Sequence, residues 1–455
     1  MTELQSIFQW WLTVFIIGVI FLPPAVKLFL NFFDKGYIFS KILGIAVVSY
    51  AIFLLGVLHI APFSFLTSVL ILTFFGIINL VFIFSFSSGK LGIKKDFLKT
   101  LKKNWSVFLL EEILFVIALL FWSYIRSFQP DIHGLEKYMD FGILNSILRS
   151  EFFPPKDIWF SPLPINYYYF GHLTTAVLTK LSNIPSNITF NLMIATIFAF
   201  TFTGSFSIGA NLISIFTSEE PIRSPQRWRL TTPLRWFWIA GGLLTALLVS
   251  LSGNLQTIYA FFKNYSGENP VPFWHLIFSP QSFPNMYWYP NATRFIPNTI
   301  HEFPLYSFVV SDLHGHVLDI PIVLLTIAIL LSLIFNFQFP ASPAGRSIFN
   351  QTKKFQILNF KFQILLLSFL LAVMYTTNAW DGFIYFLLTG LVICFLGWKQ
   401  QYEYSTIGLL VVLVFIGSII FSYPFNHFFK PFVSGIGIIC PPDFLVKAEK
   451  IGPFI

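Results

Sequence analysis

Long apolar runs separated by short polar segments dominate the chain. A helix needs roughly 20 apolar residues to cross a bilayer, and ten of the runs approach or exceed that length. A transmembrane β-barrel would show short alternating segments instead. The pattern therefore predicts an all-α, polytopic transmembrane helical bundle. We place the ten spans at residues 8–30, 38–60, 63–86, 107–125, 188–216, 237–261, 322–337, 362–377, 383–398 and 407–423.

The distribution of Lys and Arg predicts which ends of these spans face the cytoplasm. The densest basic segment holds six lysines between residues 90 and 103, and cytoplasmic loops carry an excess of such residues. Residues 167–181 are apolar but short, and a crossing there would place the arginines of 223–235 outside. We therefore predict a juxtamembrane helix on the outer face. The acidic and His-rich segments then converge on that face, in loops 126–187 and 262–304 and the turn at 378–382.

Composition agrees with a membrane protein. The chain is 56% hydrophobic and 11% charged, whereas soluble domains are about 45–50% apolar and about 25% charged. Basic cytoplasmic loops account for the net charge of +8. The predicted partner is membrane lipid, and no nucleic acid is expected.

The segment 130–172 concentrates ionisable residues beside the membrane, where they are costly unless solvated or paired. Its carboxylates can serve as a catalytic base or bind a metal, and its cations can hold a phosphate. The alternative is a solvated amphipathic helix over residues 135–150 with intrahelical ion pairs. The candidate catalytic residues are Asp131, Glu136 and Asp140, with Lys137 and Arg149 as substrate-binding candidates.

A second candidate site lies just before the seventh span. Asp312, His314 and His316 offer metal ligands within five residues, although their spacing matches no diagnostic zinc motif. The alternative is a hydrogen-bonded polar turn where a helix enters the membrane. His301 and Glu302 lie upstream and can add a ligand or a base.

Aromatic residues form the third candidate set. Tyr167, Tyr168 and Tyr169 with His172 can form a stacking and hydrogen-bonding wall for a sugar or a lipid headgroup. Interfacial tyrosine belts are common, so an anchoring role is the alternative. Trp380 and Asp381 are open to the same two interpretations.

Several motifs resemble the Chlor-Arch-YYY family of multi-pass membrane proteins from bacteria and archaea. They are EKYMDFGILNSILRS, FPPKDIWFS, INYYYFGH, TIHEFPLYSFVVSDLHGHVLDIP and TNAWD. The resemblance implies location in a bacterial or archaeal plasma membrane.

More distantly, the layout is similar to that of GT-C glycosyltransferases, which have an acidic residue in a large outer loop and use polyprenyl-phosphate-linked sugars. By position Asp131 corresponds to the loop acid, with Glu136 and Asp140 as competitors. The likeness divides the chain into three N-terminal spans with a basic loop (1–105) and a GT-C-like core (106–455). The chain ends soon after the tenth span, where the family usually continues, so truncation at the C-terminus is expected.

The leading hypothesis is a membrane glycosyltransferase that transfers a sugar from a polyprenyl-phosphate donor to an acceptor on the outer face. A divalent ion (Mg, Mn or Zn) at the Asp312 set would neutralise the leaving phosphate. The alternatives are a transporter or lipid flippase and a scaffold without chemistry. A transporter predicts ionisable residues inside the spans. The spans hold few away from their ends, and Glu111 and Glu112 are placed near the start of the fourth.

Overall fold

The structure is a computed structural model of the chain, and it describes residues 2–87, 90–93, 95–216, 232–254, 293, 300–338 and 349–430. The chain divides into two compact units, which we describe separately. Unit 1 comprises residues 1–249 and 311–430, and unit 2 comprises residues 250–310 and 431–455. Most of the predicted loop 262–304 lies outside the described residues. The division of the sequence at residue 105 stays a prediction.

Ten helices occupy the positions of the ten predicted spans, which confirms the polytopic helical fold. Eight are long and apolar enough to cross a membrane, and two, α3 and α8, are shorter apolar helices. The chain is therefore a multi-pass membrane protein. The ten helices are α1 (Glu3–Leu28), α2 (Tyr37–Val57), α3 (Phe65–Ile83), α4 (Lys95–Ser127), α7 (Ser186–Phe216), α8 (Thr232–Leu251), α12 (Gly315–Gln338), α13 (Phe349–Thr377), α14 (Ala379–Lys399) and α15 (Tyr404–Asn426).

The basic segment after α3 is more regular than the predicted loop. Strands β1 (Phe84–Ser87) and β2 (Lys90–Ile93) pair antiparallel, with Phe84 opposite Ile93. The alternation of Phe and Ser over residues 84–87 is the period-two pattern of a strand. Helix α4 then begins at Lys95, so the last lysines of the segment lie on its first turns. The predicted fourth span, residues 107–125, lies within this helix, which begins about three turns earlier.

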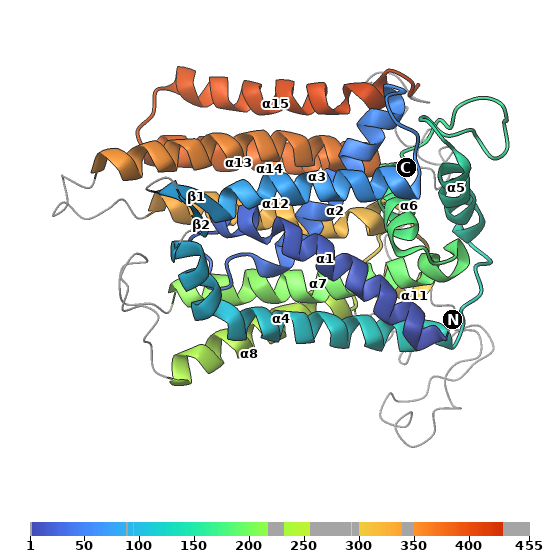
Figure 1. Ribbon diagram of the computed structural model, residues 1–455, viewed down its shortest axis with the longest axis horizontal. Coiled ribbons are helices and arrows are strands. Elements are labelled where there is room, and N and C mark those ends of the chain that lie inside the picture. The colour runs from blue at the N-terminus through green and yellow to red at the C-terminus, as the bar shows by residue number, and fades with distance from the viewer. Residues whose placement is uncertain are drawn as a thin grey trace, which may run out of the picture. The chain divides into compact units, whose positions relative to one another are not determined.

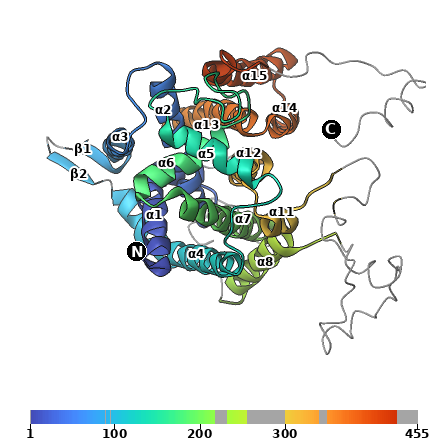
Figure 2. The ribbon, with the colours of Figure 1, turned by 90° about the vertical axis from the view of Figure 1, so that its right-hand side faces the viewer.

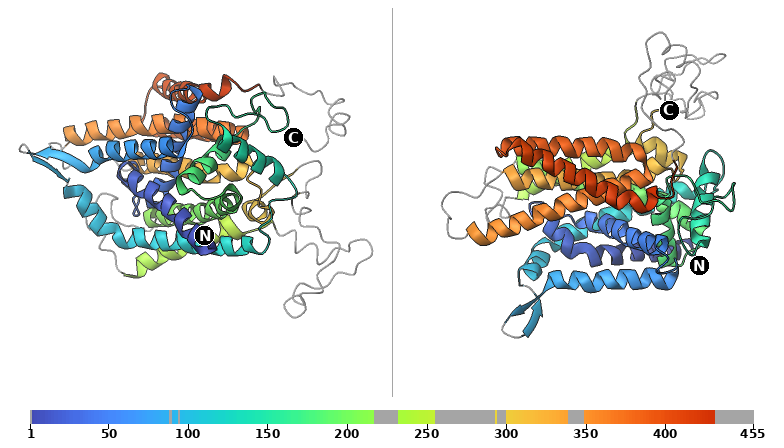
Figure 3. Two further views of the ribbon diagram at one scale, coloured as in Figure 1. Left: turned by 45° about the vertical axis from the view of Figure 1, so that its right-hand side comes forward. Right: turned by 90° about the horizontal axis from the view of Figure 1, so that it is seen from above.

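Two short helices lie across one end of the spans in unit 1. Helices α5 (Lys137–Arg149) and α6 (Phe170–Ser182) are at the opposite end from the β1–β2 hairpin (Figure 1). Figure 2 shows them in front of spans seen nearly end-on, and Figure 3 shows the same separation from two further sides. We call these two ends of unit 1 the α5 end and the hairpin end.

Helix α6 does not cross the membrane. Its 13 residues span about 20 Å, which is shorter than the hydrocarbon core of a bilayer. It is also enclosed by protein, since it packs against α1, α2, α3, α7, α12 and α13. Its buried threonines satisfy their hydroxyls locally, as Thr174 donates to the Gly171 carbonyl oxygen at 2.7 Å. The α5 end therefore has a buried helical layer behind its surface.

Helices α14 and α15 present large apolar side chains outward. Such a surface would be unfavourable in water and is expected in contact with lipid tails. The exposed residues include Leu387, Leu391 and Phe395 on α14 and Ile416 and Ile420 on α15.

The start of α12 lies against the end of α13. A Cβ atom on Gly315 would be 2.5 Å from the carbonyl oxygen of Thr377. Because backbone atoms cannot easily move apart, Gly315→Ala is expected to lower the free energy of unfolding by about 1–3 kcal/mol. Thermal unfolding in detergent measures this change. Gly390→Ala on α14 is the matched control, with no atom within 4 Å of its Cβ. Equal effects of the two substitutions would contradict the close packing.

Candidate functional site

The turn before α5 places Glu136 and Lys137 at the start of the helix. Gly134 has φ +83°, a value that only glycine adopts easily, and α5 begins at Lys137. The backbone N–H of Glu136 donates to Asp312 Oδ2 at 3.4 Å. Lys137 Nζ lies 3.2 Å from Asp312 Oδ1, and both side chains are about nine-tenths buried. Asp312 thus joins the segment before α12 to the start of α5.

Glu136 and His314 form the more exposed pair of the site. Glu136 Oε2 lies 2.6 Å from His314 Nδ1, and the side chains are 52% and 33% exposed. On the other side of the imidazole, Nε2 lies 3.4 Å from the Tyr167 hydroxyl. A neutral imidazole protonated on Nδ1 satisfies both contacts, because it donates to the carboxylate and accepts from the hydroxyl. The structure therefore places one accessible carboxylate in a defined hydrogen-bonded chain.

Asp140 and His172 lie behind this surface. Asp140 Oδ1 is 3.1 Å from His172 Nε2, and both side chains are fully buried. Asp140 projects from the buried face of α5, which also holds Ile143 and Ile147. The pair joins α5 to α6 inside the protein. An acceptor cannot reach Asp140 in this arrangement, so its predicted role as a base has less support than that of Glu136.

The acid at Asp131 lies on a loop held by Arg126. The guanidinium donates to the carbonyl oxygens of Gln129 and Asp131 and to the side chain of Asn191. Asp131 is exposed and lines a cavity of about 580 Å³ together with Arg126 and Asn187. In the described part of the chain, Glu136 contacts both Asp312 and His314, and the Asp131 carboxylate takes no part in these contacts.

The two cations predicted to share a phosphate lie at opposite ends of α5. Twelve residues separate Lys137 from Arg149, which corresponds to about 18 Å along a helix. Arg149 lines a different groove of about 780 Å³, together with Lys180 and Glu151. The two side chains therefore cannot hold one phosphate, because the rigid helix keeps them apart.

The three tyrosines have different environments. Tyr167 contacts His314, as described above. Tyr168 packs on aromatic rings, with its ring centroid 4.8 Å from that of Phe429. Tyr169 is buried and its ring contacts Phe53 and Phe425. Burial raises the pKa of all three phenols, so each stays a neutral hydroxyl at physiological pH. Only Tyr167 joins the polar cluster.

The residues predicted to bind a metal are largely engaged with other side chains. Asp312 pairs with Lys137, and His314 pairs with Glu136. Burial raises the pKa of Asp312, although the ammonium of Lys137 acts in the opposite direction. The His316 ring lies 5.2 Å from that of His314. No three His, Cys, Asp or Glu side chains come within reach of one ion in the described part of the chain, and metal binding by this set stays a prediction.

The remaining predicted residues are described within their own units. Trp380 is exposed at the start of α14, where Asp381 Oδ2 accepts a hydrogen bond from Asn378 Nδ2 at 2.8 Å. His301 and Glu302 belong to unit 2. There Glu302 Oε2 accepts a hydrogen bond from the Ser307 hydroxyl at 2.9 Å.

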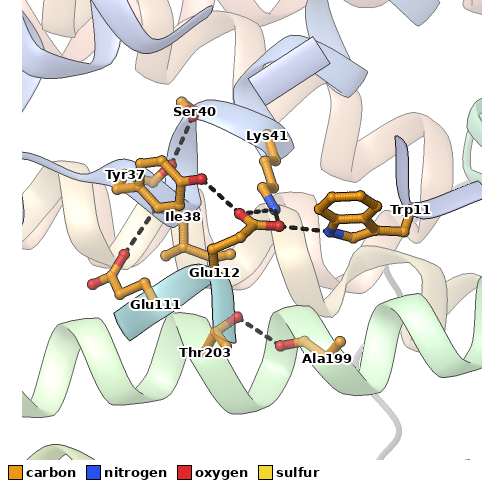
Figure 4. Close-up of polar contacts among 9 residues, drawn as sticks. All are labelled: Trp11, Tyr37, Ile38, Ser40, Lys41, Glu111, Glu112, Ala199 and Thr203. Carbon is orange, nitrogen blue, oxygen red and sulfur yellow. Dashed lines mark hydrogen bonds and ion pairs between the residues drawn. The ribbon is translucent and has the colours of Figure 1, made fainter. Parts of the chain in front are cut away.

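A buried charged cluster inside the spans was not expected from the sequence. Lys41 on α2 lies 2.6 Å from Glu112 on α4. Glu112 also accepts hydrogen bonds from the Tyr37 hydroxyl at 2.6 Å and from Trp11 Nε1 at 2.7 Å, as Figure 4 shows. Glu111 accepts from the Ile38 backbone N–H at 3.2 Å. The sequence placed both glutamates near the start of the fourth span and did not predict that Lys41 and Glu112 would pair inside the protein. Since α4 begins at residue 95, both glutamates lie about halfway along it.

A family described as an uncharacterized membrane protein (DUF2298) matches residues 47–451. None of the curated proteins and none of the solved structures that were compared matches the chain.

Proposed function

The chain belongs to the DUF2298 family of membrane proteins, and from this premise we propose that it is a membrane transferase with its active site at the α5 end of unit 1. The substrate class is a polyprenyl-phosphate-linked sugar, and the sugar passes to an acceptor hydroxyl at the membrane surface. This is a glycosyltransferase reaction of the GT-C type. The outer face of the membrane stays the predicted location of the α5 end, on the basis of the basic segments at the other end.

One observation supports this proposal more than any other. Residues from the turn before α5, from the segment before α6 and from the segment before α12 meet in one hydrogen-bonded cluster. Glu136, Tyr167 and His314 form its accessible part. A scaffold without chemistry has no need of an accessible carboxylate held by a histidine, whereas general-base catalysis requires such a group. The cluster also fits the rule that ionisable groups beside the membrane mark functional sites.

Each residue of the cluster has a role in the proposed reaction. Glu136 accepts the proton of the acceptor hydroxyl, whose oxygen then bonds to the anomeric carbon of the sugar. The bond between that carbon and the phosphate oxygen breaks, and the lipid phosphate leaves with the electron pair. Lys137 has three N–H donors, so it can hold the phosphate while it remains paired with Asp312. His314 orients Glu136, and Tyr167 orients His314.

A transporter or lipid flippase is the second candidate function. The buried cluster of Lys41, Glu111 and Glu112 supports it, because ionisable side chains inside spans often mark transport pathways. Two features favour a structural role for the cluster instead. Glu112 has a close cationic partner and two further donors, and Lys41 is almost completely buried.

One experiment separates these candidates. The purified protein in lipid nanodiscs is offered a panel of polyprenyl-phosphate sugars with simple acceptor alcohols, and mass spectrometry detects the products. The same preparation in liposomes is tested for movement of fluorescent lipids between leaflets. Sugar transfer without lipid movement supports the transferase. Lipid movement without transfer by folded protein would overturn it in favour of transport.

A further inference from the structure

Two carboxyl side chains meet where α12 and α14 begin. Asp319 lies just over one turn into α12, and Asp381 lies in the first turn of α14. The two helices pack together, and the carboxyl groups are close enough to interact directly. The sequence suggested a role for Asp381 but gave no reason to select Asp319, which is one polar residue in an apolar run.

The surroundings of Asp319 leave its charge without compensation. The side chain is fully buried, and neither of its oxygens has a hydrogen-bond donor among the described residues. A buried carboxylate without donors is unfavourable, and a second carboxylate in contact makes it more so. Asp381 is partly exposed, and one of its oxygens accepts the hydrogen bond from Asn378. The unsatisfied oxygens therefore belong to the buried member of the pair.

The neighbouring groups do not neutralise the negative charge of the two carboxylates. The N-termini of two helices stabilise nearby carboxylates, but each supplies only about half a unit charge. Among the described residues, His316 acts electrostatically on Asp381, and the Tyr385 hydroxyl lies near both carboxylates. A phenol contributes no positive charge, and His316 acts on Asp381 and not on the buried Asp319.

We propose that Asp319 and Asp381 bind a divalent cation that prefers oxygen ligands, such as Mg²⁺ or Ca²⁺. Two carboxylates match the charge of such an ion, and water or nearby oxygen groups can complete its coordination. The partly exposed Asp381 provides access, and the buried Asp319 provides the fixed ligand. This pair is separate from the set at Asp312, whose carboxylate is already paired with Lys137. The proposal does not depend on the transferase reaction.

Direct binding tests this inference. Full-length protein in nanodiscs is stripped with a chelator and titrated with Mg²⁺, Ca²⁺ or Mn²⁺ by calorimetry, with Mn²⁺ also followed by electron paramagnetic resonance. Wild type is expected to bind one ion with saturation. Asp319→Asn is expected to weaken binding by at least about tenfold, because even changes outside the ligand shell commonly cost 10- to 100-fold. Glu151→Gln, an exposed carboxylate elsewhere at the α5 end, is the matched control and should bind normally.

Two results would overturn the proposal. In the first, wild type shows no saturable binding, and its thermal unfolding depends on pH but not on divalent ions. The two carboxyl groups would then share a proton instead of binding an ion. The other is binding that neither Asp319→Asn nor Asp381→Asn weakens, because the ion would then be bound elsewhere. The Asp381→Asn variant also decides the question if Asp319→Asn does not fold, because Asp381 is partly exposed at a helix start.

Discussion

Replacing Glu136 by glutamine is expected to lower kcat for sugar transfer by about 100- to 10,000-fold, the usual contribution of a general base. The amide keeps the shape of the side chain and can still accept the hydrogen bond from His314. It cannot accept a proton from the acceptor. The KM for the lipid-linked donor should change little, because Lys137, and not Glu136, holds the phosphate in the proposed reaction.

The measurement is steady-state transfer in nanodiscs with the donor that the panel identifies. Glu151→Gln is the matched control, because it makes the same chemical change on an exposed carboxylate of the same loop. It should retain wild-type kcat. A Glu136→Gln enzyme with full activity would contradict the assignment and would make Asp131 the next candidate. His314→Ala should lower kcat without abolishing binding of the donor, because the histidine positions the carboxylate and does not contact the phosphate.

The spans could be predicted because their signal is local. A run of about 20 apolar residues is long enough to cross a bilayer whatever it packs against, and the short run at 167–181 was correctly separated from the spans. The strand pair at residues 84–93 was missed for two reasons. Residues 84–86 extend an apolar run and were assigned to the third span, and lysines in a segment between spans suggest a loop. Its alternating Phe and Ser were the available signal.

The site could be predicted only in part, because its pairs depend on tertiary packing. Topology alone suggested that the segments of Glu136 and His314 meet at one face, and unit 1 brings these two residues into contact. The sequence pattern placed Glu136 and Asp140 together on one amphipathic helix over residues 135–150. In the structure Glu136 lies at the N-cap of α5 and is half-exposed, while Asp140 turns inward to His172. No sequence pattern indicates which side chain of an adjacent helix such a carboxylate will contact.

The buried cluster in Figure 4 is expected to lose much of its stabilising effect when its cation is removed. Lys41→Met is expected to lower the free energy of unfolding by about 3–5 kcal/mol, because it leaves Glu112 buried without its cation. The measurement is equilibrium unfolding in mixed detergent micelles. Lys399→Met, an exposed lysine at the end of α14, is the matched control. Its effect should be within about 0.5 kcal/mol.

The double variant Lys41→Met with Glu112→Gln decides what the cluster does. Replacing both members of a buried ion pair is often neutral, whereas replacing one is costly. Recovery of most of the lost stability in the double variant would therefore identify a structural pair. Trp11 could still donate to the amide oxygen of the new side chain, and the Tyr37 hydroxyl could accept from its NH2 group. A stable Lys41→Met single variant would contradict this account. If that variant also lost lipid movement in liposomes, the cluster would belong to a transport pathway, and the transferase would no longer be the leading proposal.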